Sequence, residues 1–148
     1  MADPTASTVK APWHIWAVGV ASLIWNSVGA TDFLMTETRN KAYLSGFTQA
    51  QLDFCFNIPA WAVATWGIAT LGGVLGSLLI ILRRRQAVYL FVASSLCTIL
   101  TDLYSFVLSN GMKVMGGAGA MVFSAVILAI GLLLLAYSRS MSKRAVLR

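Results

Sequence analysis

Four long apolar segments constrain what this chain can fold into more than any other feature of its sequence. They run from about 13 to 31, 59 to 82, 87 to 108 and 118 to 137. A helix of about 20 mostly apolar residues crosses the roughly 30 Å hydrocarbon core of a bilayer. Short connections favour antiparallel neighbours. The sequence therefore predicts an all-α integral membrane protein, with residues 1–148 forming one membrane domain, a four-transmembrane-helix antiparallel bundle.

The composition excludes two other classes of protein. Hydrophobic residues make up 58% of the chain and charged residues 11%, which excludes a soluble enzyme domain and a disordered chain. The net charge of +6 would suggest a nucleic-acid partner in a soluble protein, but here the cations stand beside the apolar segments. We therefore expect the lipid bilayer as a partner and no nucleic acid.

The first segment also fits a second interpretation. Lys10, the apolar run and the small residues 28–30 resemble a signal peptide with its cleavage site. The run is long for a signal core and carries Trp13, Trp16 and Trp25. We expect a retained membrane helix.

Basic residues predict the orientation of the bundle, because Lys and Arg in short flanks resist translocation. Eight lie on one side, namely Lys10, Arg83, Arg84, Arg85, Arg139, Lys143, Arg144 and Arg148. Three lie on the other side, namely Arg39, Lys41 and Lys113. We expect the tails 1–12 and 138–148 to be cytoplasmic.

The predicted outer loop, residues 32–58, is the one long connection. Thr48 and Gln51 have the spacing of a capping box, so a short helix is expected to begin near Gln49. Its mixed polar and apolar residues suit the membrane surface, and their strict alternation weakens the helical interpretation. The segment is either an interfacial cap on the bundle or a lid over a ligand site.

Asp102 is the first candidate for function, because an acid inside a membrane span is costly and usually faces the bundle interior. Counting from the predicted helix ends puts Asn26, Thr65 and Ser124 at a similar depth. Two interpretations remain open. Asp102 either forms a structural hydrogen bond to Asn26 or a hydroxyl, or it binds a cation, a proton or a hydroxyl-rich solute. In the second case the pocket would also include the aromatic residues Trp61, Trp66 and Tyr104.

Neither a metal site nor a cofactor site is indicated by the motifs. His14 is the only histidine and has no Cys or Glu at ligand spacing. Cys55 and Cys97 differ by about 15 Å in predicted depth, too far for a disulfide between them. No nucleophile and base pair or phosphate loop is recognisable, so we expect no enzyme activity.

Small residues in the second segment indicate close helix packing. Gly72 and Gly76 form a GxxxG pair, and Gly73 and Ser77 repeat the spacing. The packing could lie within one bundle or between subunits. Leucine at Gly72 or Gly76 should disturb it, and Gly67 is expected to tolerate change better.

Several short motifs together resemble a known family. They are Trp25, Asn26, Gly29 and Asp32; Thr38, Arg39, Asn40 and Tyr43; Pro59, Ala60 and Trp61; and Ser109, Asn110 and Gly111. The chain resembles, over nearly its whole length, uncharacterised small four-helix bacterial inner-membrane proteins that are loosely labelled as sugar transporters. The resemblance implies a bacterial inner-membrane location and supplies no mechanism or substrate.

Two functions follow as hypotheses. The first is a non-enzymatic accessory or scaffold component that packs in a homo-oligomer or with other membrane protein subunits. The alternative is a small-solute protein that binds or transports a sugar or a cation through the outer-half pocket around Asp102.

The orientation can be tested with reporter fusions after Arg148. A reporter active only in the cytoplasm should be active there, because of the eight-to-three imbalance of basic residues. A periplasm-only reporter should be silent, and the opposite pattern would overturn the assignment.

Overall fold

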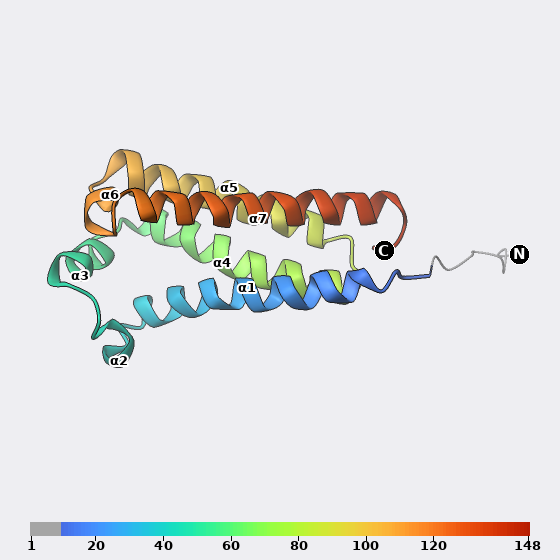
Figure 1. The fold of residues 1–148 in the computed structure, drawn as a ribbon, viewed down its shortest axis with the longest axis horizontal. Coiled ribbons are helices and arrows are strands. Elements are labelled where there is room, and N and C mark those ends of the chain that lie inside the picture. Colours follow the sequence, from blue (N-terminus) through green and yellow to red (C-terminus); the bar gives the residue numbers. More distant parts are fainter. Residues whose placement is uncertain (1–9) are drawn as a thin grey trace, which may run out of the picture.

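The computed structural model describes residues 10–148, and every regular element in this range is helical (Figure 1). Residues 1–9 of the predicted tail lie outside the described residues. The elements are α1 (His14–Glu37), α2 (Lys41–Leu44), α3 (Gln49–Phe56), α4 (Ala60–Ile81), α5 (Ala87–Leu103), the π-helical turn η1 (Tyr104–Leu108), α6 (Gly111–Val114) and α7 (Ala118–Lys143). Among the described residues, α1, α4, α5 with η1, and α7 are long and apolar enough to cross a membrane. The predicted fold class is confirmed, and the chain is a small multi-pass membrane protein.

Helix α4 holds the bundle together. It packs along α1 on one side and along α5 on the other, and α7 packs along α5. In Figure 1 the four long helices lie side by side along the long axis of the molecule. We call the end that carries Arg83–Arg85 the arginine end, and the opposite end, with residues 38–59, the loop end. Helix α1 begins and α7 ends at the arginine end.

Most of the apolar core lies near the arginine end. Its buried side chains are Ile15, Ile80, Ala87, Phe91, Leu134, Met141, Val146 and Leu147. Here α1 also meets α7, because His14 Nδ1 and Tyr137 Oη are 2.7 Å apart. After α7 the chain turns back across the arginine end, toward the connection between α4 and α5. The Arg148 N–H donates to the Arg83 carbonyl at 2.7 Å, and the Arg85 N–H donates to the Arg148 carbonyl at 2.8 Å.

Local sequence explains where the helices begin and end. The capping box of Thr48 and Gln51 is present, and α3 begins at Gln49 as predicted. Helix α1 ends with the Arg39 N–H bonded to the Thr36 carbonyl and the Asn40 N–H bonded to the Met35 carbonyl, the two bonds of a Schellman motif. Arg39 therefore has a φ of 52°, a conformation that glycine favours.

Two boundaries differ from those expected. Helix α1 continues six residues beyond Thr31, because a Schellman motif rather than a drop in hydropathy ends it. Helix α7 continues from Tyr137 to Lys143. Residues 32–37, which the sequence places in the outer loop, therefore belong to α1, and the loop begins after Glu37.

Glycines let α4 approach both of its neighbours. Gly73 is covered by the Asn26 side chain of α1, and Gly76 by the Phe91 ring of α5. A Cβ at Gly67 would lie 2.9 Å from the Phe33 ring, so the expectation that Gly67 tolerates change better than Gly72 is wrong. A Cβ at Gly72 would make an ordinary contact of 3.5 Å with Ser94.

Adjacent glycines therefore give a matched pair for a packing test. In Gly73→Ala the new methyl group overlaps Asn26, which must move and lose its 3.2 Å bond to Ser77. We expect the free energy of unfolding to fall by about 1–3 kcal/mol. Gly72→Ala should leave it unchanged or raise it slightly, since the methyl group has room and alanine favours helix. Denaturation in mild detergent measures both, and equal stability of the two variants would contradict the packing described.

Candidate functional site

Two polar pairs lie at one level near the loop end. The Ser124 hydroxyl of α7 donates to the Asp102 carboxylate of α5 at 2.5 Å. The Thr65 and Thr101 hydroxyls of α4 and α5 are 3.0 Å apart. Because Thr101 and Asp102 are consecutive, three of the four long helices contribute to this level. Asp102 therefore makes a hydroxyl contact, as one of the two open interpretations expected.

Asn26 does not belong to this level. Its Nδ2 donates to the Ser22 carbonyl at 2.8 Å and to Ser77 Oγ at 3.2 Å. Ser77 and Thr65 are twelve residues apart on α4, a rise of about 18 Å. The predicted layer of four residues is therefore corrected to three. The depth of Asn26 was counted from Thr31, but α1 ends at Glu37.

The aromatic candidates also separate. Trp61 and Tyr104 meet edge to face, with ring centroids 5.5 Å apart, and Tyr104 also stacks on Phe54 of α3 at 6.4 Å. Trp66 instead meets Phe33 of α1 at 5.1 Å. Trp61 and Tyr104 therefore help to hold α3 against the loop end, whereas Trp66 belongs to the contact between α1 and α4.

The π-helical turn places Tyr104 in this contact. It follows Asp102 and Leu103 directly, and the Ser109 hydroxyl donates to the Tyr104 carbonyl at 2.8 Å. A π-helical turn changes the direction of the side chains beyond it, and such turns are frequent near functional sites. No periodicity in the residues around Tyr104 predicts this turn.

The loop is also tied to the end of α1. Tyr43 of α2 donates its hydroxyl to the Asp32 carboxylate at 2.7 Å. This hydrogen bond, followed by partial burial and the Asp32 charge, raises the pKa of Tyr43 to about 12. At neutral pH the Tyr43 hydroxyl therefore keeps its proton and remains a hydrogen-bond donor to Asp32.

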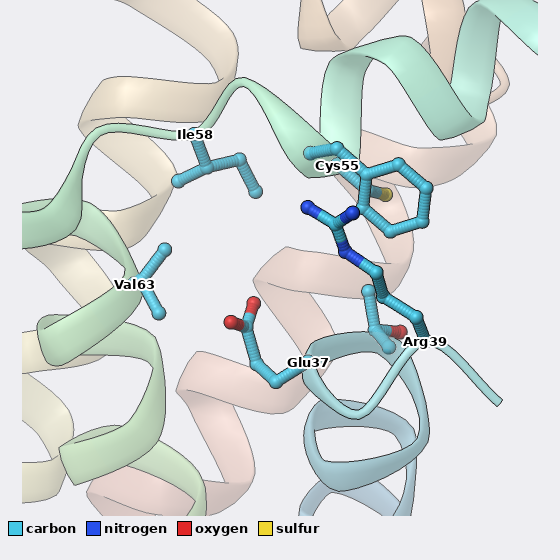
Figure 2. Close-up of a pocket in the computed structure, with 7 residues that line it drawn as sticks. Glu37, Arg39, Cys55, Ile58 and Val63 are labelled. Carbon is cyan, nitrogen blue, oxygen red and sulfur yellow. The ribbon is translucent and has the colours of Figure 1, made fainter.

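A cavity of about 140 Å³ lies between the end of α1, α3 and the start of α4 (Figure 2). Its lining residues are Thr36, Glu37, Arg39, Cys55, Phe56, Ile58 and Val63. Figure 2 shows the Glu37 carboxylate and the Arg39 guanidinium extending toward the same space, with Ile58 and Val63 on its far side. The Arg39 guanidinium carbon also lies 4.5 Å from the centre of the Phe56 ring.

Cys55 forms part of the cavity wall and is buried. Burial, with the negative charges of Asp32 and Glu37, raises the pKa of the Cys55 thiol. The thiol is therefore neutral and weakly nucleophilic at pH 7. Within residues 10–148 no group of three or more His, Cys, Asp or Glu side chains is placed to hold a metal ion.

Neither Glu37 nor Arg39 is among the site residues that the sequence predicts. Glu37 falls in the predicted outer loop, and Arg39 is one of the basic residues that indicate orientation and one of the residues that carry the family resemblance. Arg39 and Asn40 follow the last turn of α1, and a chain reversal is common at this position after a helix. The sequence could therefore have indicated the turn, although not the residues that meet it. The meeting of Glu37 and Arg39 with α3 and α4 depends on contacts distant in sequence.

Comparison with known proteins adds no further constraint: no protein family, curated protein or solved structure matches this chain.

A double-mutant cycle measures the bond between Asp102 and Ser124. Ser124→Ala should destabilise the bundle, because it leaves the Asp102 carboxyl without its hydroxyl partner. In the Asp102→Ala background the same change should have little effect, giving a coupling free energy of about 0.6–1.7 kcal/mol. Unfolding of the four proteins in detergent gives this value, and strictly additive effects would mean that the pair does not stabilise the bundle.

Proposed function

We propose that the chain is a non-enzymatic component of the bacterial inner membrane, which assembles with copies of itself or with another membrane subunit. The face used for assembly is formed by the loop-end halves of α5 and α7. This proposal rests on one observation, the incomplete burial of Asp102 and Ser124 inside spans that the chain itself covers poorly.

Burial is distributed unevenly along these two helices. The buried residues of α5 are Ala87, Phe91 and Ser95, and those of α7 are Leu134, Ser138 and Met141. All of them lie toward the arginine end. Toward the loop end, Asp102 and Ser124 are each half-buried, and their neighbours Leu103 and Phe123 are exposed.

A carboxyl group in this position is unfavourable next to lipid. An acid at the centre of a membrane helix costs about 2.5–3.5 kcal/mol on insertion scales and is normally covered by protein or water. Asp102 lies six residues from the Leu108 end of its span, so its cost is a part of that figure. Ser124 is its one hydrogen-bond partner within residues 10–148. A second subunit over this face would remove the remaining exposure, and interhelical hydrogen bonds are a common source of association in membranes.

The location and family are part of the proposal. The eight basic residues beside the arginine end favour a cytoplasmic location for that end. The motifs at Trp25, Arg39 and Trp61 support membership in the inner-membrane family described above, whose members are loosely labelled as sugar transporters.

Solute binding or transport is the second candidate, and one observation favours it. Asp102 carries no basic partner within residues 10–148, so its free lone pairs could accept a cation or a hydroxyl-rich solute such as a sugar. In that case Asp102→Asn should keep the protein folded and abolish solute-dependent behaviour.

Assembly can be tested by removing the polar group. Asp102→Leu should shift the purified protein from oligomer to monomer, because the exposed polar pair that favours a partner is gone. Light scattering in mild detergent and energy transfer between labelled copies in liposomes report the oligomeric state.

Thr31→Leu is the matched control. Thr31 is exposed on α1, and its hydroxyl is already bonded to the Ser27 carbonyl at 2.8 Å in its own helix. Its replacement should leave assembly unchanged. The proposal loses its basis if the parent protein forms neither an oligomer nor a complex with another membrane subunit. It also loses its basis if Asp102→Leu assembles like the parent.

A further inference from the structure

The cavity at the loop end contains an acid and a base that do not neutralise each other. Glu37 and Arg39 line the same space of about 140 Å³. Within residues 10–148 no ion pair joins the two side chains, although only one residue separates them in the chain. The Schellman motif at Arg39 turns the chain sharply between them.

A third polar group faces the cavity. Thr36 lines it, is 2% exposed, and its hydroxyl has no hydrogen-bond partner within residues 10–148. Among residues 10–148 the one fully buried side-chain polar atom without a partner is Ser95 Oγ, so the Thr36 hydroxyl is accessible from the cavity and can offer a hydrogen bond to a ligand there. The remaining lining includes the apolar side chains of Ile58 and Val63, which Figure 2 shows on the far side.

We propose that this cavity binds a small zwitterion, with its anionic group on Arg39 and its ammonium group on Glu37. A guanidinium presents N–H groups that suit a carboxylate or phosphate, and a carboxylate accepts hydrogen bonds from an ammonium. A simple anion would be repelled by Glu37, and a simple cation by Arg39. A molecule that carries both charges a few ångströms apart satisfies both side chains.

The size of the space limits the ligand. A volume of 140 Å³ equals that of four or five water molecules at about 30 Å³ each. A small amino acid fits this volume, and so does the ethanolamine part of a lipid headgroup. These two sources share the same chemistry, because both place an ammonium near an anionic oxygen.

Arg39 is held ready for such a ligand. Its guanidinium lies over the Phe56 ring at 4.5 Å, and this cation–π contact fixes the side chain without occupying its outer N–H groups. Its backbone has a φ of 52°, a conformation that is uncommon for residues other than glycine, asparagine and aspartate. Glycine would suit this backbone conformation as well, so the turn itself does not require the guanidinium.

Arg39→Gly is therefore a sharp test variant. It removes the guanidinium and relaxes the backbone, so thermal stability should equal or exceed that of the parent. Ala145→Gly is the matched control, because Ala145 has a φ of 54° at the end of α7. Glu37→Gln tests the other charge while keeping the size of the side chain.

The experiment uses the full chain in phosphatidylglycerol nanodiscs, because that lipid carries no ammonium group. Calorimetry measures binding of glycine, alanine and phosphoethanolamine, with acetate and methylammonium as singly charged probes. A second arm adds phosphatidylethanolamine to the nanodiscs and measures by native mass spectrometry which lipid is retained.

We expect at least one of the two arms to show zwitterion binding, at least tenfold tighter than either singly charged probe in the first arm. Arg39→Gly and Glu37→Gln should each weaken it at least tenfold, and Ala145→Gly should not change it. Binding in the first arm identifies a free solute, and selective retention in the second identifies a lipid headgroup. Absence of binding in both arms, or binding that survives both charge substitutions, would overturn the proposal. The result is independent of the oligomeric state of Asp102→Leu.

Discussion

The close approach of α4 to both of its neighbours is the contact on which the rest of the bundle depends. Lipid gives no hydrophobic drive for helices to associate, so packing and interhelical hydrogen bonds must supply it. Gly73 and Ser77 receive Asn26 from α1, and Gly76 receives the Phe91 ring from α5. A polar side chain and an aromatic ring thus fill the two faces of one small-residue helix. The third interface, between α5 and α7, has Gly131 opposite Ser95.

This arrangement gives the two ends of the molecule different characters. At the arginine end, Ile15 of α1 joins the core formed by the other helices, so all four contribute to it. At the loop end, polar and aromatic contacts replace the apolar core. Tyr104 and Phe54 attach α3, and the hydrogen bond from Tyr43 to Asp32 attaches α2. The proposed assembly face and the proposed zwitterion cavity both lie toward this less densely packed end.

Sequence predicted the architecture well because each span carries its own signal of length and hydropathy. The start of α3 was equally local, since Thr48 and Gln51 form the capping box within one turn. The candidate site was harder to predict. Asn26 was misplaced because the end of α1 is set by backbone bonds at Arg39 and Asn40, which hydropathy does not reveal. The residues that line the cavity with Glu37 come mainly from α3 and the start of α4, and the periodicity of α1 does not predict which residues these are.

The turn of chain after α7 has a consequence for the order in which the protein is made. Residues 146–148 bury two apolar side chains and pair their backbone with the connection between α4 and α5. During synthesis these residues leave the ribosome after all four spans. The two backbone bonds between Arg148 and the connection at Arg83–Arg85 can therefore form only after every membrane helix has been synthesised. Closing of the arginine end is a step that follows their synthesis, and a helix hairpin of α4 and α5 made alone would lack it.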